Sequence, residues 1–255
     1  MTRDELLRLR CTDADWDIWQ ARAQEDAVWR QTRAHRRAVE TAKLALEEFA
    51  SQGEGYVSVS WGKDSCAVLL LAAEVLPTWP VVHVRIQPVE NPDCVLVRDA
   101  YLRMFPRLAA RYVEIVVRCV PKYSTGRYDT NLAYAQGFAQ ADRAFGGRYV
   151  SGVRSDESAV RRLTVGRNGL VSKNTCRPIG RWNGSDVFAS LVDAPLHPAY
   201  PCSQDGVVPR ERVRVNNLWG LYAEAVGRAE WEQRYYRDAL RNIRLEHQRD
   251  CGKLG

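Results

Sequence analysis

A short loop between a predicted strand and a predicted helix constrains this chain more than any other feature. The loop reads Ser60-Trp61-Gly62-Lys63-Asp64-Ser65, and it lies between the apolar run 56–59 and the apolar stretch 66–73. A strand that ends in a tight turn before a helix directs several unpaired backbone N–H groups at one place, where the helix dipole also favours an anion. The loop therefore predicts a binding site for a polyphosphate.

Most residues of the loop have a chemical reason to be there. Gly62 lets the backbone approach a phosphate closely, and Lys63 adds a mobile positive charge. The hydroxyls of Ser60 and Ser65 can donate to phosphate oxygens, while Asp64 can cap the helix or help to hold a magnesium ion. The spacing differs from the Walker-type loop, which has four residues between its glycines and a Gly-Lys-Ser/Thr order.

The loop resembles the Ser-x-Gly-Lys-Asp-Ser signature of the PP-loop ATP pyrophosphatases. This superfamily includes phosphoadenylyl-sulfate (PAPS) reductases, FAD synthetases, DNA phosphorothioation enzymes and tRNA thiolases. The resemblance implies that the loop binds ATP or phosphoadenylyl sulfate, with magnesium as a further cofactor. Trp61 replaces the usual glycine of the signature, and its side chain is expected to wall the nucleotide pocket or to stack on a base.

A second segment, 148–162, reads as a strand, a glycine turn and a polar helix start. It resembles the Gly-x-Arg-x-x-Glu-Ser-x-x-Arg element of PAPS-reductase-like proteins, which implies that Gly152, Arg154, Glu157 and Arg161 face the phosphate end of the nucleotide. Arginine offers a planar, permanently charged fork that matches phosphate or sulfate oxygens. The alternative interpretation of these arginines is a solvated basic helix start.

A third segment, 177–191, is similar to the Pro-Ile-x-x-Trp-x-x-x-Asp-Val-Trp-x-x-Leu segment of the same family. Either Asn183 or Ser185 can cap a short helix here. Trp182 and Phe188 are expected to be packing residues of the core. The three segments occur in the family's order, and the resemblance covers residues 56 to 200.

Strands and helices alternate through the middle of the chain. The residue pattern predicts strands at 56–59, 81–86, 113–118 and 149–153, with helices at 94–108 and 131–145. This order predicts an α/β fold with a doubly wound, mostly parallel sheet, in which ligands lie at the carboxyl ends of the strands. Ile86, at the end of the second strand, is then a candidate for backbone contact with adenine.

The ends of the chain are expected to be helical. Residues 13–50 predict one long helix or two shorter ones, which pack on their own domain or on a second subunit of a homo-oligomer. A hairpin is expected at 161–176, a long irregular segment at 193–217 and a final helix at 218–248. The predicted organisation is an N-terminal helical extension (1–52), a nucleotide-binding domain (53–217) and a C-terminal helix and tail (218–255).

Composition and charge limit the cellular location, the partners and the metal sites that we expect for the protein. No apolar run approaches the roughly 20 residues that span a bilayer, so we expect a cytoplasmic protein without a membrane partner. The net charge of +6 is compatible with a polyanionic partner, and the acceptor is left open between a nucleic acid and a protein. The seven cysteines include no Cys-Cys or Cys-x-x-Cys pair, so neither structural zinc nor an iron–sulfur cluster is expected.

Three functions are consistent with this pattern. The first is attack of an acceptor on the α-phosphate of ATP with release of pyrophosphate, in a sulfur-transfer or nucleic-acid modification pathway. The second is thiol-dependent reduction of phosphoadenylyl sulfate by Cys251, since Asp250-Cys251-Gly252 resembles the family's Glu-Cys-Gly-Leu-His segment. The third is a non-catalytic nucleotide-binding subunit of a nucleic-acid-modifying complex. The candidate catalytic residues are Lys63, Asp64, Arg154 and Cys251.

Overall fold

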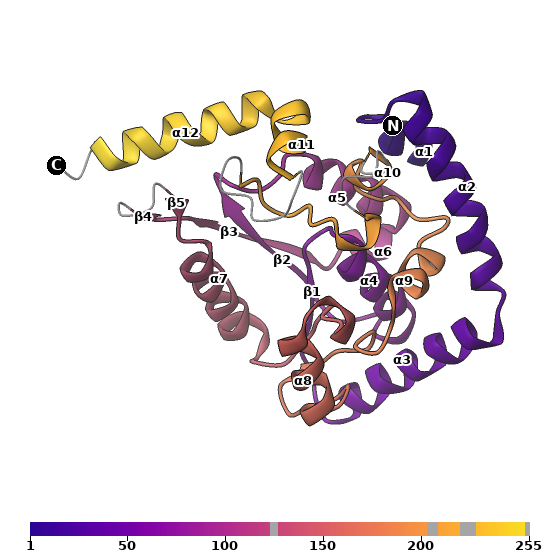
Figure 1. The fold of residues 1–255 in the computed structure, drawn as a ribbon. Helices are drawn as coiled ribbons and strands as arrows, with labels where there is room; N and C mark the ends of the chain where they lie inside the picture. Colours follow the sequence, from indigo (N-terminus) through magenta and orange to yellow (C-terminus); the bar gives the residue numbers. More distant parts are fainter. Residues whose placement is uncertain (123–126, 203–208, 220–227, 253–255) are drawn as a thin grey trace.

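A five-stranded parallel sheet forms the centre of the protein (Figure 1). The computed structural model describes residues 1–122, 127–202, 209–219 and 228–252. The strand order is β3-β2-β1-β6-β7, and every pairing in this sheet is parallel. Its strands are β1 (Tyr56–Val59), β2 (Val81–Gln87), β3 (Tyr112–Arg118), β6 (Tyr149–Val150) and β7 (Thr175–Cys176). The predicted α/β fold with a parallel sheet is confirmed.

The remaining described elements are mostly helices. A small antiparallel pair, β4 (Pro121–Lys122) and β5 (Arg127–Tyr128), follows β3. The helices up to β3 are α1 (Arg3–Arg8), α2 (Asp13–Arg30), α3 (Arg33–Ser51), α4 (Lys63–Val75), α5 (Asp93–Met104) and α6 (Pro106–Ala109). Those after β5 are α7 (Thr130–Phe145), η1 (Ser155–Glu157), α8 (Ala159–Asn168), α9 (Gly184–Ser190), α10 (Ala199–Cys202), η2 (Arg210–Arg212), α11 (Arg228–Tyr235) and α12 (Arg237–Gly252).

Helices cover both faces of the sheet, and the strand sequences show why. Successive side chains of a strand point to opposite faces, and in β2 both sets are buried. Val84 and Ile86 pack with Ala133 of α7 on one face. Val81 packs with the cluster that contains the apolar residues of α4 on the other. A strand that is apolar on both sides favours such a central position in a doubly wound sheet.

The chain changes direction across the sheet at β1. From β1 it proceeds outward through β2 to β3, and it then returns to place β6 and β7 on the other side of β1. Val57 accordingly pairs with Val81 of β2 on one side and with Val150 of β6 on the other. The carboxyl ends of β1 and β6 therefore meet at a topological switch point, where sheets of this class bind ligands.

The predicted hairpin at 161–176 is correct only at its C-terminal end, where Val171 and Cys176 form an antiparallel bridge. Residues 159–168 instead form helix α8, which Ser158 caps by accepting the N–H of Arg161. Gly166 lies inside this helix. The helix ends instead at Gly169, whose φ of +67° favours glycine. The fourth predicted strand is also shorter than expected, since β6 ends at Val150.

The terminal helices pack on the domain. The region 13–50 forms two helices, α2 and α3, and the buried Trp16 and Trp19 belong to the same apolar cluster as Val57 of β1. Packing on the chain's own domain is thus confirmed, while the division at 52 and 217 stays a prediction. The final helix is divided into α11 and α12 around Tyr236, and residues 220–227 of the predicted helix lie outside the described residues. Among the described helices, none has the length and apolar character that a membrane crossing requires.

Close packing of α7 on the sheet gives the first prediction. A Cβ added at Gly137 would lie 2.2 Å from Cγ1 of Val84, whereas one at Gly166 would meet nothing within 4 Å. We expect Gly137→Ala to lower the free energy of unfolding by about 1–3 kcal/mol, because a stiff valine must move. The control Gly166→Ala should raise it by up to about 1 kcal/mol, because alanine favours the helix. Urea unfolding measures both, and equal effects would contradict this packing.

Candidate functional site

The loop after β1 begins helix α4 without a side-chain cap. Gly62 is the N-cap residue and its helix has no side-chain capping bond, whereas capping threonines begin α2 and α3. The Ser65 hydroxyl turns back into the loop, where it donates to the Gly62 carbonyl at 2.9 Å and accepts the Ser60 N–H at 3.1 Å. The two serine hydroxyls lie 3.3 Å apart. The serines therefore shape the turn that presents the first N–H groups of α4.

Three charged side chains from two elements meet at this helix start. The Asp64 carboxylate accepts from Lys63 Nζ at 2.7 Å and from Arg154 Nε at 2.6 Å. Lys63 is 3% exposed and Arg154 is 1% exposed, so both cations are almost fully buried. Arg154 follows β6, and it also donates to the Trp182 carbonyl at 3.3 Å. The structure thus brings Arg154 to Lys63 and Asp64, although it lies 90 residues beyond Asp64 in the sequence.

Gly152 makes this meeting possible. A Cβ at position 152 would lie 2.9 Å from the backbone N of Ser65 and 3.0 Å from the carbonyl carbon of Asp64. Only glycine lets the backbone after β6 come this close to the first turn of α4. Beyond it, Glu157 accepts the Arg154 N–H at 3.2 Å and forms an ion pair with Arg161. Glu157 therefore holds the backbone of Arg154 and the guanidinium of Arg161.

Trp61 occupies the left-handed region, with a φ of +59°. Its side chain is fully buried and packs among the rings of His83, Tyr101 and Tyr112. This corrects the expectation that the indole stacks on a base, because a fully buried ring is not available to a ligand. Trp61 can therefore contribute only its backbone to the site. That backbone has a conformation that glycine adopts more readily.

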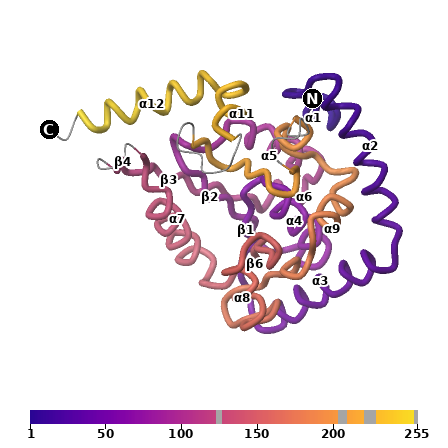
Figure 2. Tube along the Cα trace, viewed as in Figure 1, coloured from indigo at the N-terminus to yellow at the C-terminus, as the bar shows by residue number. Residues whose placement is uncertain are grey.

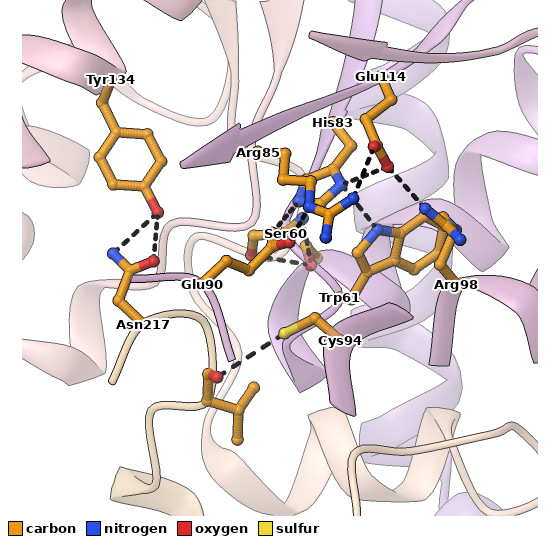
Figure 3. Close-up of polar contacts among 12 residues, drawn as sticks. Ser60, Trp61, His83, Arg85, Glu90, Cys94, Arg98, Glu114, Tyr134 and Asn217 are labelled. Carbon is orange, nitrogen blue, oxygen red and sulfur yellow. Dashed lines mark hydrogen bonds and ion pairs between the residues drawn. The ribbon is translucent and has the colours of Figure 1, made fainter. Parts of the chain in front are cut away.

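A network of charged side chains lies around the indole of Trp61 (Figure 3). Trp61 Nε1 lies 3.2 Å from His83 Nδ1, and His83 Nε2 lies 2.7 Å from Glu90. Burial opposes protonation of His83, but hydrogen bonds to Glu114 and Glu90 raise its pKa above the ordinary 6.5. His83 is therefore buried within a charged network.

Two arginines complete this network. Arg85 forms ion pairs with Glu90 at 2.9 Å and with Glu114 at 3.2 Å, and Arg98 contacts Glu114 at 2.8 Å. Hydrogen bonds from His83, then from Arg98, Tyr112 and Arg85, hold the pKa of Glu114 well below its ordinary value. The carboxylate therefore stays ionised, and the network keeps opposite charges in contact beneath the loop.

Tyr200 and residues 215–216 cover the loop, although the sequence analysis did not assign them to the site. The Lys63 N–H donates to the Tyr200 hydroxyl at 2.8 Å. A Cβ built at Gly62 would lie 3.5–3.7 Å from atoms of Asn216, Tyr200 and Val215. Burial raises the pKa of Tyr200 well above its ordinary value, so the hydroxyl remains protonated. The signal in the sequence was only the irregular composition of 193–217, which does not identify these residues.

The other two predicted site residues, Ile86 and Cys251, lie away from the charged cluster at the start of α4. Ile86 is buried at the end of β2, and its carbonyl already accepts the N–H of Glu90 at 2.9 Å. Cys251 lies in the last turn of α12, where its Sγ is 3.6 Å from His247 Nδ1. His247 packs on Tyr128 of β5, beyond the β3 edge of the sheet. The structure does not bring Cys251 to the loop.

Burial disfavours the thiolate form of the other cysteines. It raises the pKa of Cys66, next to the loop, to about 12. Burial likewise raises the thiol pKa of Cys11, Cys94, Cys119, Cys176 and Cys202. A nucleophilic role requires the thiolate, so these positions favour a packing role for the thiols.

Asp64 is the residue of the loop that fits a magnesium ion. Within the described residues, no group of three or more His, Cys, Asp or Glu side chains is arranged to hold a metal. Magnesium is commonly held by one or two carboxylates together with substrate phosphates and water. The single carboxylate of Asp64 at the helix start fits a magnesium ion that is bound jointly with a polyphosphate.

No protein-family model and no curated protein matches the chain. Four solved protein chains do. One of these structures is described as the U34-tRNA thiolase NcsA from Methanococcus maripaludis with its 4Fe–4S cluster. It is 10% identical, the match covers 84% of this chain and 80% of that chain, and the TM-score is 0.44.

This neighbour requires one correction. The cysteine spacing led to the expectation that no iron–sulfur cluster is present. That expectation is contradicted by a structural neighbour that carries a 4Fe–4S cluster. The expectation is withdrawn.

The buried Trp61 gives a prediction about the loop. Trp61→Ala and Trp61→Gly should each lower the free energy of unfolding by about 3–5 kcal/mol, because both remove a buried indole. Glycine adopts a positive φ without the strain that alanine carries, so Trp61→Gly should be the more stable by about 1 kcal/mol. Urea unfolding of both variants measures the difference. A Trp61→Ala protein at least as stable as Trp61→Gly would show that the loop is not held in the left-handed region.

His197 gives a pH-dependent prediction for the segment over the loop. Its Nδ1 accepts the Ala199 N–H at 3.1 Å, and burial lowers its pKa to about 4. Between about pH 6.5 and 4 the unfolded chain binds a proton that the folded chain does not. Stability should therefore be complete above pH 6.5 and fall by on the order of 3 kcal/mol as pH drops to 4. Urea unfolding across this range should show a shallower fall for His197→Asn, and parallel curves would contradict the assignment.

Proposed function

We propose that this chain is a PP-loop ATP pyrophosphatase of the PAPS reductase-like group. On this proposal it binds an adenine nucleotide in the crevice between β1 and β6, and residues 53–217 are its nucleotide-binding unit. The observation that carries the proposal is the meeting of Lys63, Asp64 and Arg154 at the start of α4. Two buried cations beside the N-terminus of α4, whose N-cap residue Gly62 has no side chain to cap it, suit a polyphosphate.

The phosphate groups would be held by backbone and side chains together. The first N–H groups of α4 point along the helix dipole, and the hydroxyls of Ser60 and Ser65 lie in the same turn. Lys63 supplies a point charge, and Arg154 supplies a planar fork. Arg161, oriented by Glu157, is placed to extend the basic surface toward a terminal phosphate or sulfate.

On this proposal the adenine binds beside the end of β2. Strand β1 pairs with β2 only as far as His83, so residues 84–87 extend past the end of β1 on the side of the loop. A strand edge left without a neighbour can offer backbone groups to a base. Ile86 is the residue that we propose for this contact, through its backbone rather than through its buried side chain.

The reaction would occur at the α-phosphorus. An acceptor oxygen forms a bond to that phosphorus, the bond from the α-phosphorus to the bridging oxygen breaks, and pyrophosphate leaves with that electron pair. Lys63 and Arg154 would spread the charge that develops on the phosphate oxygens. Magnesium, held by Asp64 together with the phosphates, would supply further positive charge. The products are an adenylated acceptor and pyrophosphate.

The structure gives no support to the reductase alternative. That reaction needs a thiolate at the sulfate, whereas Cys251 packs near His247 at the far end of α12. The choice between an independent enzyme and a nucleotide-binding subunit of a larger complex depends on whether the isolated chain releases pyrophosphate.

The role of Lys63 is directly testable. Lys63→Ala should weaken ATP binding by about 10- to 100-fold, because a charge-assisted hydrogen bond contributes about 1.5–3 kcal/mol. Lys43→Ala is the matched control, since it removes a lysine that pairs with Glu74 away from the loop. Titration calorimetry with ATP and magnesium, beside a pyrophosphate-release assay, measures both variants. Equal ATP affinity in wild type and Lys63→Ala would refute the loop assignment.

A further inference from the structure

One face of α12 carries a row of arginines. Arg237, Arg241 and Arg244 follow one another at spacings of four and three residues, which places them on the same side of the helix. All three are exposed. Over seven residues the row extends for about 10 Å along the helix axis. The row continues to the exposed Gln248, one turn further on.

These arginines line a hollow of about 410 Å³ in the surface. Its other lining residues are Gln233, Leu240, Leu245 and Gln248, so among the described residues no acidic side chain lines it. Many arginines elsewhere pair with carboxylates, for example Arg118 with Glu246 and Arg210 with Asp26. No such pairing joins the three hollow arginines to any carboxylate of the described residues.

Two of the three acidic residues of α12 lie off this face, since Glu246 and Asp250 both pair with Arg118, the last residue of β3. Asp238 lies in the first turn, three residues before Arg241 and therefore beside the row. Three arginines against this one carboxylate leave the row with a net positive charge.

The position of the helix relates this row to the proposed nucleotide site. Because Arg118 ends β3, its ion pairs tie α12 to the carboxyl edge of the sheet, the edge at which the loop after β1 also lies. Figures 1 and 2 show α12 extending beyond the ends of β2 and β3. A long ligand could contact α12 and reach the loop along one edge.

We propose that the hollow on α12 binds the phosphodiester backbone of a nucleic acid, which would be the acceptor of the proposed adenylation. The part about the acceptor rests on the proposed function. Arginine is the residue best suited to bind phosphate by a planar fork. A row of about 10 Å exceeds one phosphate and spans several along a strand, whose axial spacing in a duplex is about 3.4 Å. The two glutamines add uncharged donors for phosphate or sugar.

The test measures binding of a fluorescein-labelled RNA hairpin and a labelled DNA duplex by fluorescence anisotropy at several salt concentrations. The wild-type protein should bind at least one of them. Arg241→Glu combined with Arg244→Glu should weaken that binding at least tenfold and make its salt dependence shallower by about two phosphate contacts. The milder pair of glutamine substitutions at the same positions should weaken it in the same direction.

The control is Arg36→Glu with Arg37→Glu on the exposed surface of α3, which changes the net charge equally. An equal loss in the control pair, or no binding by the wild-type protein, would overturn the inference. ATP titration of the same proteins keeps the two proposals separate. ATP binding should be unchanged in all variants, and failure of the wild-type protein to bind ATP would count against the proposed function rather than against the nucleic-acid surface.

Discussion

The site depends on the ion pair between Arg154 and Asp64, because it joins the two halves of the sheet at the point where the strand order reverses. Arg154 is almost completely buried. Removal of a guanidinium from water costs several kcal/mol unless a counter-charge and hydrogen-bond acceptors replace the water. Asp64 supplies the charge, the Trp182 carbonyl accepts another N–H, and the missing side chain at Gly152 permits the approach. A single carboxylate thereby fixes the turn after β6 against the start of α4.

The loop itself is held by a second set of interactions on its inner side. A non-glycine residue in the left-handed region costs on the order of 1 kcal/mol or more. The fully buried indole of Trp61 offsets this cost through its contacts with three rings and its hydrogen bond to His83. The same residue that strains the backbone thus anchors it, and the network of Glu90 and Glu114 sets the position of His83. The loop is shaped by the core below it as much as by its own sequence.

The sequence predicted the features that depend on local pattern. The first three strands, the α/β fold and a cap at Asn183 or Ser185 follow from periodicity and cap chemistry, and the structure has Asn183 as the cap of α9. It could not predict that Trp61 faces the core, because the direction of a side chain in a turn depends on its tertiary partners. Nor could it identify Tyr200 above the loop, since a hydroxyl 137 residues away leaves no local signal. The predicted hairpin began too early because Gly166 and Gly169 look equally suited to a turn in the sequence. Of these two residues, only Gly169 adopts a positive φ.

The arrangement of charges has a consequence for the proposed binding of nucleotide. A phosphate that accepts hydrogen bonds from Lys63 and Arg154 competes with the Asp64 carboxylate, which accepts from both. The negative charge of Asp64 must then be balanced in another way, because it lies beside a polyphosphate in a site with limited access to water. A divalent cation shared between the carboxylate and the phosphates balances both. On the proposed function, magnesium and nucleotide would therefore bind in a coupled manner: phosphates that pair with Lys63 and Arg154 would free the Asp64 carboxylate to hold the metal.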